Sequence, residues 1–150
     1  MRRTDPFGKS PSRRLVQHPR FYFFDGGVLN GLLGNFAVSG DRMGRLFEHL
    51  VINQIFHEAS ARDQDIRLTS YRTEHGAEVD LIFERGGETW AIEIKASQSV
   101  RTEELGGLRS FRDYHGQKHR ACVFYMGTVQ KNLNGVELWP WQEGLRELFK

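Results

Sequence analysis

The chain has 150 residues, a net charge of +2, one cysteine, and hydrophobic and charged fractions of 39% and 27%, which predict one globular domain with a single core. The sequence has no apolar run near the roughly 20 residues that span a membrane, and no apolar segment follows the basic N-terminus as a secretory signal requires. The single cysteine, Cys122, excludes an internal disulfide and a cysteine-based zinc cluster, and together these features favour the cytoplasm.

Residues 1–20 are expected to form a basic, flexible arm or linker in front of a domain at residues 21–150. Asp5 is the one acidic residue of this segment, against Arg2, Arg3, Lys9, Arg13, Arg14 and Arg20. Its prolines and serines are typical of a linker. The segment is either a solvated tail or an arm that contacts phosphates, and the sequence leaves both readings open.

Two helices are predicted before residue 60. The stretch "FYFFDGG" (21–27) reads as a short strand ending at Asp25, which then serves as N-cap of a short helix through "GVLNGLLG". Asp41 is expected to cap a second helix that runs to about Ala59. The glycines in this region match neither a phosphate-binding loop nor a dinucleotide fingerprint.

Glu48 is the first candidate functional residue, because it falls within the apolar part of the second helix. At 100° per residue, apolar side chains cover most of the helix circumference around it: Leu46, Phe47, Leu50, Val51, Ile52, Ile55 and Phe56. A carboxylate in that position is costly unless it is paired or bound to a metal. The alternative is a glutamate that extends to the edge of the helix and reaches solvent.

A strand at 66–73 precedes a β-hairpin made of "AEVDLIF" (77–83) and "TWAIEIKA" (89–96). A two-residue primed turn at Gly86-Gly87 sets its register. One face of the hairpin, expected to lie on the core, then carries the apolar pairs Phe83–Trp90, Leu81–Ile92 and Val79–Ile94. The other face carries Glu84–Thr89, Ile82–Ala91, Asp80–Glu93 and Glu78–Lys95.

Asp80 and Glu93 are the central candidates, because this register puts two carboxylates side by side with Lys95 on the same face. Like charges opposite each other destabilise a sheet. A divalent cation offsets that cost, since paired carboxylates are ligands that Mg²⁺ and Mn²⁺ favour. Two alternatives stay open: a solvent-exposed polar face, and a salt-bridge network through Glu78 and Lys95.

The remaining elements are a helix at 101–115, strands at 120–127 and 135–140, and a last helix from Pro140 or Trp141. The whole order predicts a mixed α/β fold, in which a mixed sheet is flanked by helices.

The order of Glu48 on a helix, Asp80 on one strand and Glu93-Ile94-Lys95 on the next resembles the PD-(D/E)XK nuclease superfamily, although Val79 stands where that motif has proline. The chain resembles the DUF4143 family more closely, through four blocks in that family's order: "RFYFFDGGVLNGLLG", "GRLFEHLVINQI", "YRTEHGAEVDLIF" and "AIEIKAS". The resemblance covers about residues 20–115. DUF4143 domains are typically the C-terminal domains of bacterial and archaeal AAA-type ATPases.

The resemblance implies a restriction-endonuclease-like core and Mg²⁺- or Mn²⁺-dependent hydrolysis of phosphodiester bonds in DNA, by endo- or exonucleolytic cleavage. Glu48, Asp80, Glu93 and the backbone carbonyl of Ile94 would bind the metal, and Lys95 would orient the attacking water or neutralise charge on the phosphate. The expected contacts to nucleic acid are Arg72, Arg109 and Arg112. An AAA-type ATPase domain or subunit is the expected partner, with this chain as a stand-alone copy or a fragment.

Two other functions are compatible with the sequence. One is a catalytically inactive module of such an ATPase that binds nucleic acid or protein, since a fold does not fix a function. The other is an interaction domain without metal or nucleic acid, for which Trp139-Pro140-Trp141 and the phenylalanines would supply an apolar surface.

Overall fold

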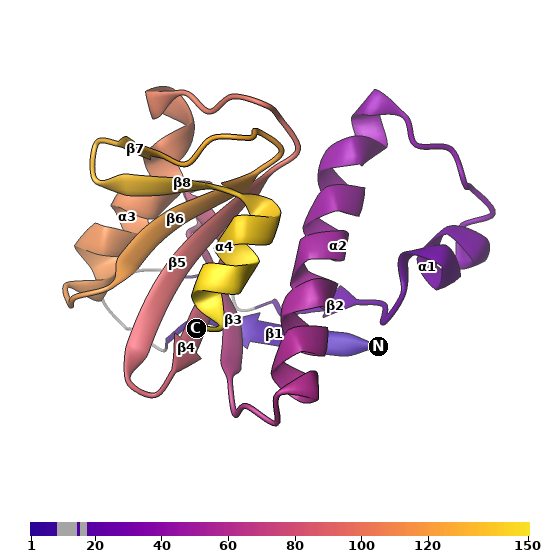
Figure 1. Cartoon of the computed structure of the whole chain (residues 1–150), viewed down its shortest axis with the longest axis horizontal. Helices are drawn as coiled ribbons and strands as arrows, with labels where there is room; N and C mark the ends of the chain where they lie inside the picture. Colours follow the sequence, from indigo (N-terminus) through magenta and orange to yellow (C-terminus); the bar gives the residue numbers. More distant parts are fainter. Residues whose placement is uncertain (9–14, 16–17) are drawn as a thin grey trace.

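The computed structural model describes residues 1–8, 15 and 18–150, and in these residues it forms one mixed eight-stranded sheet with the order β2-β1-β3-β4-β5-β6-β8-β7. Helices α2 (Gly40–Ala61) and α4 (Trp141–Leu148) pack on one face of the sheet, and α3 (Gly106–His115) packs on the other (Figure 1). The predicted mixed α/β fold with flanking helices is therefore confirmed. No helix in the described ranges is long and apolar enough to cross a membrane.

The remaining helices are α1 (Gly26–Leu32) and the 3₁₀ turn η1 (Thr102–Leu105). The strands are β1 (Arg2–Pro6), β2 (Arg20–Tyr22), β3 (Arg67–Arg72), β4 (Glu78–Arg85), β5 (Glu88–Lys95), β6 (Arg120–Tyr125), β7 (Lys131–Leu133) and β8 (Val136–Pro140). The bounds of β3, β4, β5, β6 and β8 lie within two residues of the predicted ones, whereas β1 and β7 were not predicted.

Strand β1 corrects the expectation that residues 1–20 form a flexible arm. Arg2–Pro6 pairs antiparallel with β2 and parallel with β3, and Thr4 is fully buried between them. A five-residue polar segment has no clear alternation of apolar residues, so its pairing with distant strands leaves no periodic signal in the sequence. The sheet thus includes residues ahead of the predicted boundary at residue 21, while Lys9, Arg13 and Arg14 lie outside the described residues.

The first two helices begin differently from each other. Asp25 is the N-cap of α1, as predicted, since its Oδ1 accepts a hydrogen bond from the Val28 amide at 3.0 Å. Ser39 rather than Asp41 holds the N-cap position of α2, so that prediction was wrong; Asp41 lies in the first turn, where its charge suits the helix dipole. Helix α1 has no buried residue and lies on the far side of α2 from the sheet (Figure 1).

The hairpin register is confirmed close to its turn. Gly86 and Gly87 have φ of +55° and +85°, as a primed turn requires, and the ladder runs from Arg85–Glu88 to Leu81–Ile92. Beyond Leu81 the prediction fails, because the three expected pairs that include Asp80–Glu93 are absent from the ladder. The pairing of β3 with β4 shifts register between Thr69 and Tyr71.

The second face of the hairpin is also buried, contrary to the predicted polar face. The side chains of Ile82 and Ala91 are fully buried with Val79 in the cluster beneath α3. Val79 was expected on the opposite face with Leu81, so the alternation of side chains breaks between these two residues. Both faces of β4 and β5 are therefore core, and the candidate residues Asp80, Glu93 and Lys95 lie toward the end of these strands that is away from the turn.

Strands β6 and β8 are tied together by an ion-pair network that we call the Arg120 cluster (Arg120, Glu137, Glu147 and Lys150). Arg120 donates to both oxygens of Glu137 at 2.9 and 2.6 Å and to Glu147 at 3.2 Å, while its guanidinium lies 3.8 Å from the Trp90 ring centroid. Trp139 and Trp141 pack against the neighbouring core rather than forming a separate apolar surface. Cys122, also in β6, is fully buried.

Candidate functional site

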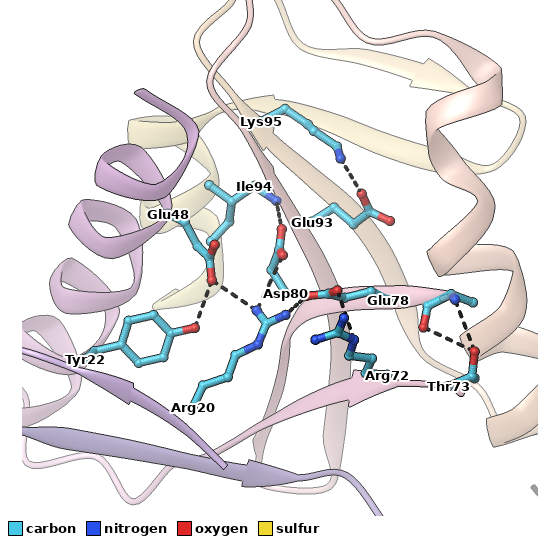
Figure 2. A network of polar contacts seen from close by, with 11 residues as sticks. Arg20, Tyr22, Glu48, Arg72, Thr73, Glu78, Asp80, Glu93, Ile94 and Lys95 are labelled. Atoms are coloured by element: carbon cyan, nitrogen blue, oxygen red, sulfur yellow. Dashed lines mark hydrogen bonds and ion pairs between the residues drawn. The ribbon is translucent and has the colours of Figure 1, made fainter. Parts of the chain in front are cut away.

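Three elements bring the predicted site residues to one region. Helix α2 contributes Glu48, strand β4 contributes Asp80, and strand β5 contributes the Glu93-Ile94-Lys95 segment. In Figure 2 the Asp80 carboxylate lies between Glu48 on one side and Glu93 on the other. The predicted site residues thus form two groups, with Glu48 on one side of Asp80 and Glu93 with Lys95 on the other.

Asp80 is anchored where the β4–β5 ladder ends. Its Oδ2 accepts a hydrogen bond from the backbone amide of Ile94 at 2.8 Å. The carboxylate thus accepts the hydrogen bond that the Ile94 amide would otherwise donate to the backbone of β4. This explains why the ladder stops after Leu81. The two strands separate here, and the carboxylate fills the space between them.

One of the two interpretations of Glu48 was a side chain that extends freely to solvent, and the structure does not show this. Its Oε1 accepts hydrogen bonds from the Tyr22 hydroxyl at 2.8 Å and from the Arg20 guanidinium at 3.1 Å. Only 24% of its side chain is exposed. The carboxylate on the largely apolar helix is therefore paired, in agreement with the cost of burying it alone.

Arg20 is the site residue that the sequence reasoning missed. Its guanidinium forms ion pairs with Glu48 at 3.1 Å and Asp80 at 3.7 Å, and it also pairs with Glu78 (Figure 2). We call these four residues the Arg20 cluster. The signal available in the sequence was the position of Arg20 at the start of an apolar strand, which ties it to the sheet rather than to a free arm.

Glu93 and Lys95 form the second group. Lys95 Nζ lies 3.0 Å from Glu93 Oε2, and the Glu93 side chain is only 6% exposed. Helix α3 closes over it at Gly107, where a Cβ would lie 2.7 Å from Glu93 Oε1 and would overlap the carbonyl oxygen of Glu78. Only glycine permits this approach, so α3 sets how deeply Glu93 is buried.

Burial dominates the electrostatics of the three predicted carboxylates. It raises the pKa of Glu48, Asp80 and Glu93, and the neighbouring Asp80 charge raises the pKa of Glu48 further. Burial opposes the charge on Lys95, but the charge and hydrogen bond of Glu93 outweigh it, so the pKa of Lys95 is raised. Lys95 therefore remains a cation, while burial destabilises the charged form of the three carboxylates.

The donor atoms fit a hard divalent cation in kind, since Mg²⁺ and Mn²⁺ prefer carboxylate oxygens. The arrangement is not that of a preformed metal site, because Glu48 and Asp80 form ion pairs with Arg20, and Glu93 forms one with Lys95. Among the residues that the structure describes, no three acidic, histidine or cysteine side chains are already grouped to hold a metal. A cation could enter only if one of these ion pairs opened.

The predicted nucleic-acid contacts fall in two places. Arg72 lies beside the Arg20 cluster, with its Nε 3.7 Å from Glu78 Oε2. Arg109 and Arg112, on α3, instead line a separate cavity of about 340 Å³ whose apolar wall includes Leu108 and Val136. The three arginines are thus not brought together around the carboxylates.

Comparison with known families gives one match. The family model described as "Domain of unknown function (DUF4143)" matches residues 43–143, a range that contains Glu48, Asp80, Glu93 and Lys95 but not Arg20. No curated protein matches the chain.

Proposed function

We propose a nuclease function for this chain, which belongs to the DUF4143 family. The proposed reaction is the hydrolysis of phosphodiester bonds in DNA with Mg²⁺ or Mn²⁺, by a domain with the PD-(D/E)XK core that works with an AAA-type ATPase domain or subunit. The observation that carries the proposal is the convergence of Glu48, Asp80, Glu93 and Lys95, from one helix and two adjacent strands, at the end of the β4–β5 ladder.

The order of elements supports the proposed core. Helix α2 is followed by the antiparallel strands β3, β4 and β5, then by α3, and then by β6, which runs parallel to β5. This is the order of helix, three antiparallel strands, helix and strand that the resemblance implies. The candidate carboxylates occupy the first helix and the second and third of these strands.

Each side chain has a definite role in the proposal. Asp80, Glu48, Glu93 and the Ile94 carbonyl would hold the cation, with Asp80 fixed in place by the Ile94 amide. A divalent cation bound there would lower the pKa of a water molecule and stabilise negative charge on the phosphate. Lys95, a cation held by Glu93, would neutralise charge on the phosphate rather than act as a base. Arg72, with Arg109 and Arg112 further along the surface, would contact the DNA backbone.

Cleavage of supercoiled and linear DNA in Mg²⁺ or Mn²⁺ tests the proposal. We expect Asp80→Ala to lower the rate by about 100-fold or more, because it removes a ligand and the anchor of the site. Asp65→Ala is the matched control, since Asp65 is an exposed aspartate beside the Gly86-Gly87 turn, at the other end of the hairpin from Asp80. Cleavage that persists in Asp80→Ala would be assigned to a contaminant, and the proposal would fall.

The second candidate is a non-catalytic module that binds nucleic acid or protein for an ATPase. The pairing of Arg20 with Glu48, Glu78 and Asp80 favours it, because an arginine already supplies a cation to the carboxylates. Titration calorimetry with Mn²⁺ separates the two functions. DNA binding without measurable Mn²⁺ binding in either the wild type or an Arg20 variant would favour the non-catalytic module.

A further inference from the structure

Arg20 holds the place among the carboxylates that a cation would take. Its guanidinium contacts one carboxylate from α2 and two from β4, and only 24% of its side chain is exposed. A guanidinium is planar and has five donors, so it can bridge several carboxylates at once. In Figure 2 its nitrogens lie among the oxygens of Glu48, Glu78 and Asp80.

The charges around Arg20 are not balanced by it alone. Three carboxylates face Arg20, and Arg72 adds a second, more exposed cation at 3.7 Å from Glu78. Carboxylates that are buried close together favour the binding of positive charge. The negative charge of the three carboxylates is therefore large enough to bind a divalent ion. The ion and the Arg20 guanidinium cannot occupy the same position among them.

A cavity beside the cluster can accommodate the Arg20 side chain. A cavity of about 470 Å³ adjoins the cluster, lined by Arg20 itself and by Tyr22, Arg45, Glu48, His49 and Glu78. Tyr22 holds Glu48 independently through its hydroxyl. The guanidinium can therefore swing into the cavity while Glu48 and Asp80 keep their hydrogen bonds to Tyr22 and to the Ile94 amide.

We infer that Arg20 is an internal competitor of the metal, which occupies the carboxylate site in the free protein and must be displaced before a divalent cation binds. The inference rests on the proposed function, because it takes Glu48 and Asp80 as metal ligands. It adds that metal binding is regulated by the position of the Arg20 side chain. A change that draws the Arg20 side chain away from Glu48 and Asp80, with Tyr22 still bound to Glu48, would raise the affinity for the metal. The segment of the chain that begins at Arg20 thereby regulates the site that α2, β4 and β5 build.

Titration calorimetry with Mn²⁺ on the full chain tests this competition. In Arg20→Met we expect the dissociation constant for Mn²⁺ to fall by about tenfold or more, because the apparent affinity of the wild type is reduced by the small fraction of molecules in which Arg20 has left the site. Arg72→Met is the matched control, since it removes an equal charge beside the same cluster without vacating its centre. We expect less than about a twofold change there, because an exposed charge is screened by solvent and salt.

The possible results separate the inference from the proposed function. Tighter Mn²⁺ binding in Arg20→Met than in Arg72→Met supports both. Equal, measurable binding in the wild type, Arg20→Met and Arg72→Met overturns the competition and leaves the metal site standing, as does an equal gain in both variants. No Mn²⁺ binding in any variant overturns both the competition and the metal-dependent function.

A second variant covers the case in which Arg20→Met does not fold. Arg20→Lys keeps the positive charge, but its amine is a point charge that cannot bridge three carboxylates as a guanidinium does. We expect it to bind Mn²⁺ more tightly than the wild type and less tightly than Arg20→Met. Affinity equal to that of the wild type in a folded Arg20→Lys protein would count against the inference.

Discussion

The Arg20 cluster and the Arg120 cluster each place one arginine among several carboxylates, yet they differ in charge balance. Arg120 and Lys150 face two glutamates, Glu137 and Glu147, and the guanidinium also stacks on Trp90. Arg20 faces three carboxylates, and among the described residues the one other ion pair of these carboxylates is that of Glu78 with Arg72. Among the described residues, two cations match the two glutamates of the first cluster, whereas the second has three carboxylates against two arginines.

The pKa shifts in the two clusters have opposite directions. Hydrogen bonds from Arg120 and Lys150 hold the pKa of Glu137 and of Glu147 below its usual range. Burial raises the pKa of Glu48 and Asp80 despite the presence of Arg20. The difference teaches that an arginine among carboxylates is not by itself evidence of function. What separates a structural network from a candidate site is whether the carboxyl pKa values stay raised in the presence of the arginine.

The largest effect on stability is expected from Arg120→Met. The change removes a bidentate pair and leaves two glutamates without their arginine, which should cost about 3 kcal/mol and lower the melting temperature by roughly 5–10 °C. Urea denaturation measures the loss, and calorimetry should show unchanged Mn²⁺ binding. A loss of stability under about 1 kcal/mol, or weaker Mn²⁺ binding, would remove the distinction between the two clusters.

Gly107→Ala is expected to disturb the candidate site from the α3 side. The new methyl would overlap the Glu78 carbonyl and press on Glu93, so we expect a loss of about 2 kcal/mol together with weaker Mn²⁺ binding. Gly106→Ala is the control, because a Cβ there would meet no atom within 4 Å beyond its chain neighbours and the backbone of its own helix, among the described residues. Equal stability of the two variants in urea would show that α3 does not hold Glu93 in place.

Tyr22→Phe should cost about 1 kcal/mol, since it removes one hydrogen bond to a largely buried carboxylate. Combined with Arg120→Met, the two losses should add to within about 0.5 kcal/mol, because the clusters share no partner. Combined with Arg20→Met, the losses should not add, because both residues bind Glu48. A double-mutant cycle in urea checks both expectations, and coupling between Tyr22 and Arg120 would contradict them.

The smallest effect is in the dependence of stability on pH. Because the folded pKa of Glu137 is lowered, its contribution is complete above the ordinary glutamate pKa of about 4.3 and is lost as the pH falls through the lower folded value. The raised pKa of Glu48 and Asp80 has the opposite sign, so protonation of these groups adds stability as the pH falls from 7.

We therefore expect the stability deficit of Arg120→Met to shrink by under about 1 kcal/mol below pH 4. Over the range from pH 7 toward the ordinary carboxyl pKa, the wild type should gain a similar small amount of stability. Denaturation curves at several pH values measure both changes. A deficit of Arg120→Met that grows on acidification would contradict the lowered folded pKa of Glu137.

Local patterns predicted much of the fold. The Gly86-Gly87 turn fixed the hairpin register for five pairs, since two glycines at positive φ restrict the turn to a primed type. The Asp25 cap and the final helix from Trp141 are likewise local features. Asp41 was misplaced because Ser39, Gly40 and Asp41 offer competing helix starts two residues apart.

The features that the sequence did not reveal depend on contacts between distant segments. The break after Leu81 arises because Asp80 binds the Ile94 amide, and the burial of Ile82 and Ala91 depends on α3, which follows later in the chain. Arg20 was assigned to an arm because six basic residues dominate that segment. The pairing of β2 with β1 and the contacts of the same segment with α2 bring Arg20 to the carboxylates. The candidate residues could therefore be named from the sequence, while their grouping could not.

The buried Cys122 is a natural probe for opening of the sheet. It is the chain's single cysteine, it lies in β6, and burial raises the pKa of its thiol, so a thiol reagent reacts with it only after the sheet opens. The rate of labelling by a maleimide thus measures the opening of the strands behind the candidate site. The same protein, without any added label site, can therefore show whether a divalent cation closes its structure or leaves it unchanged.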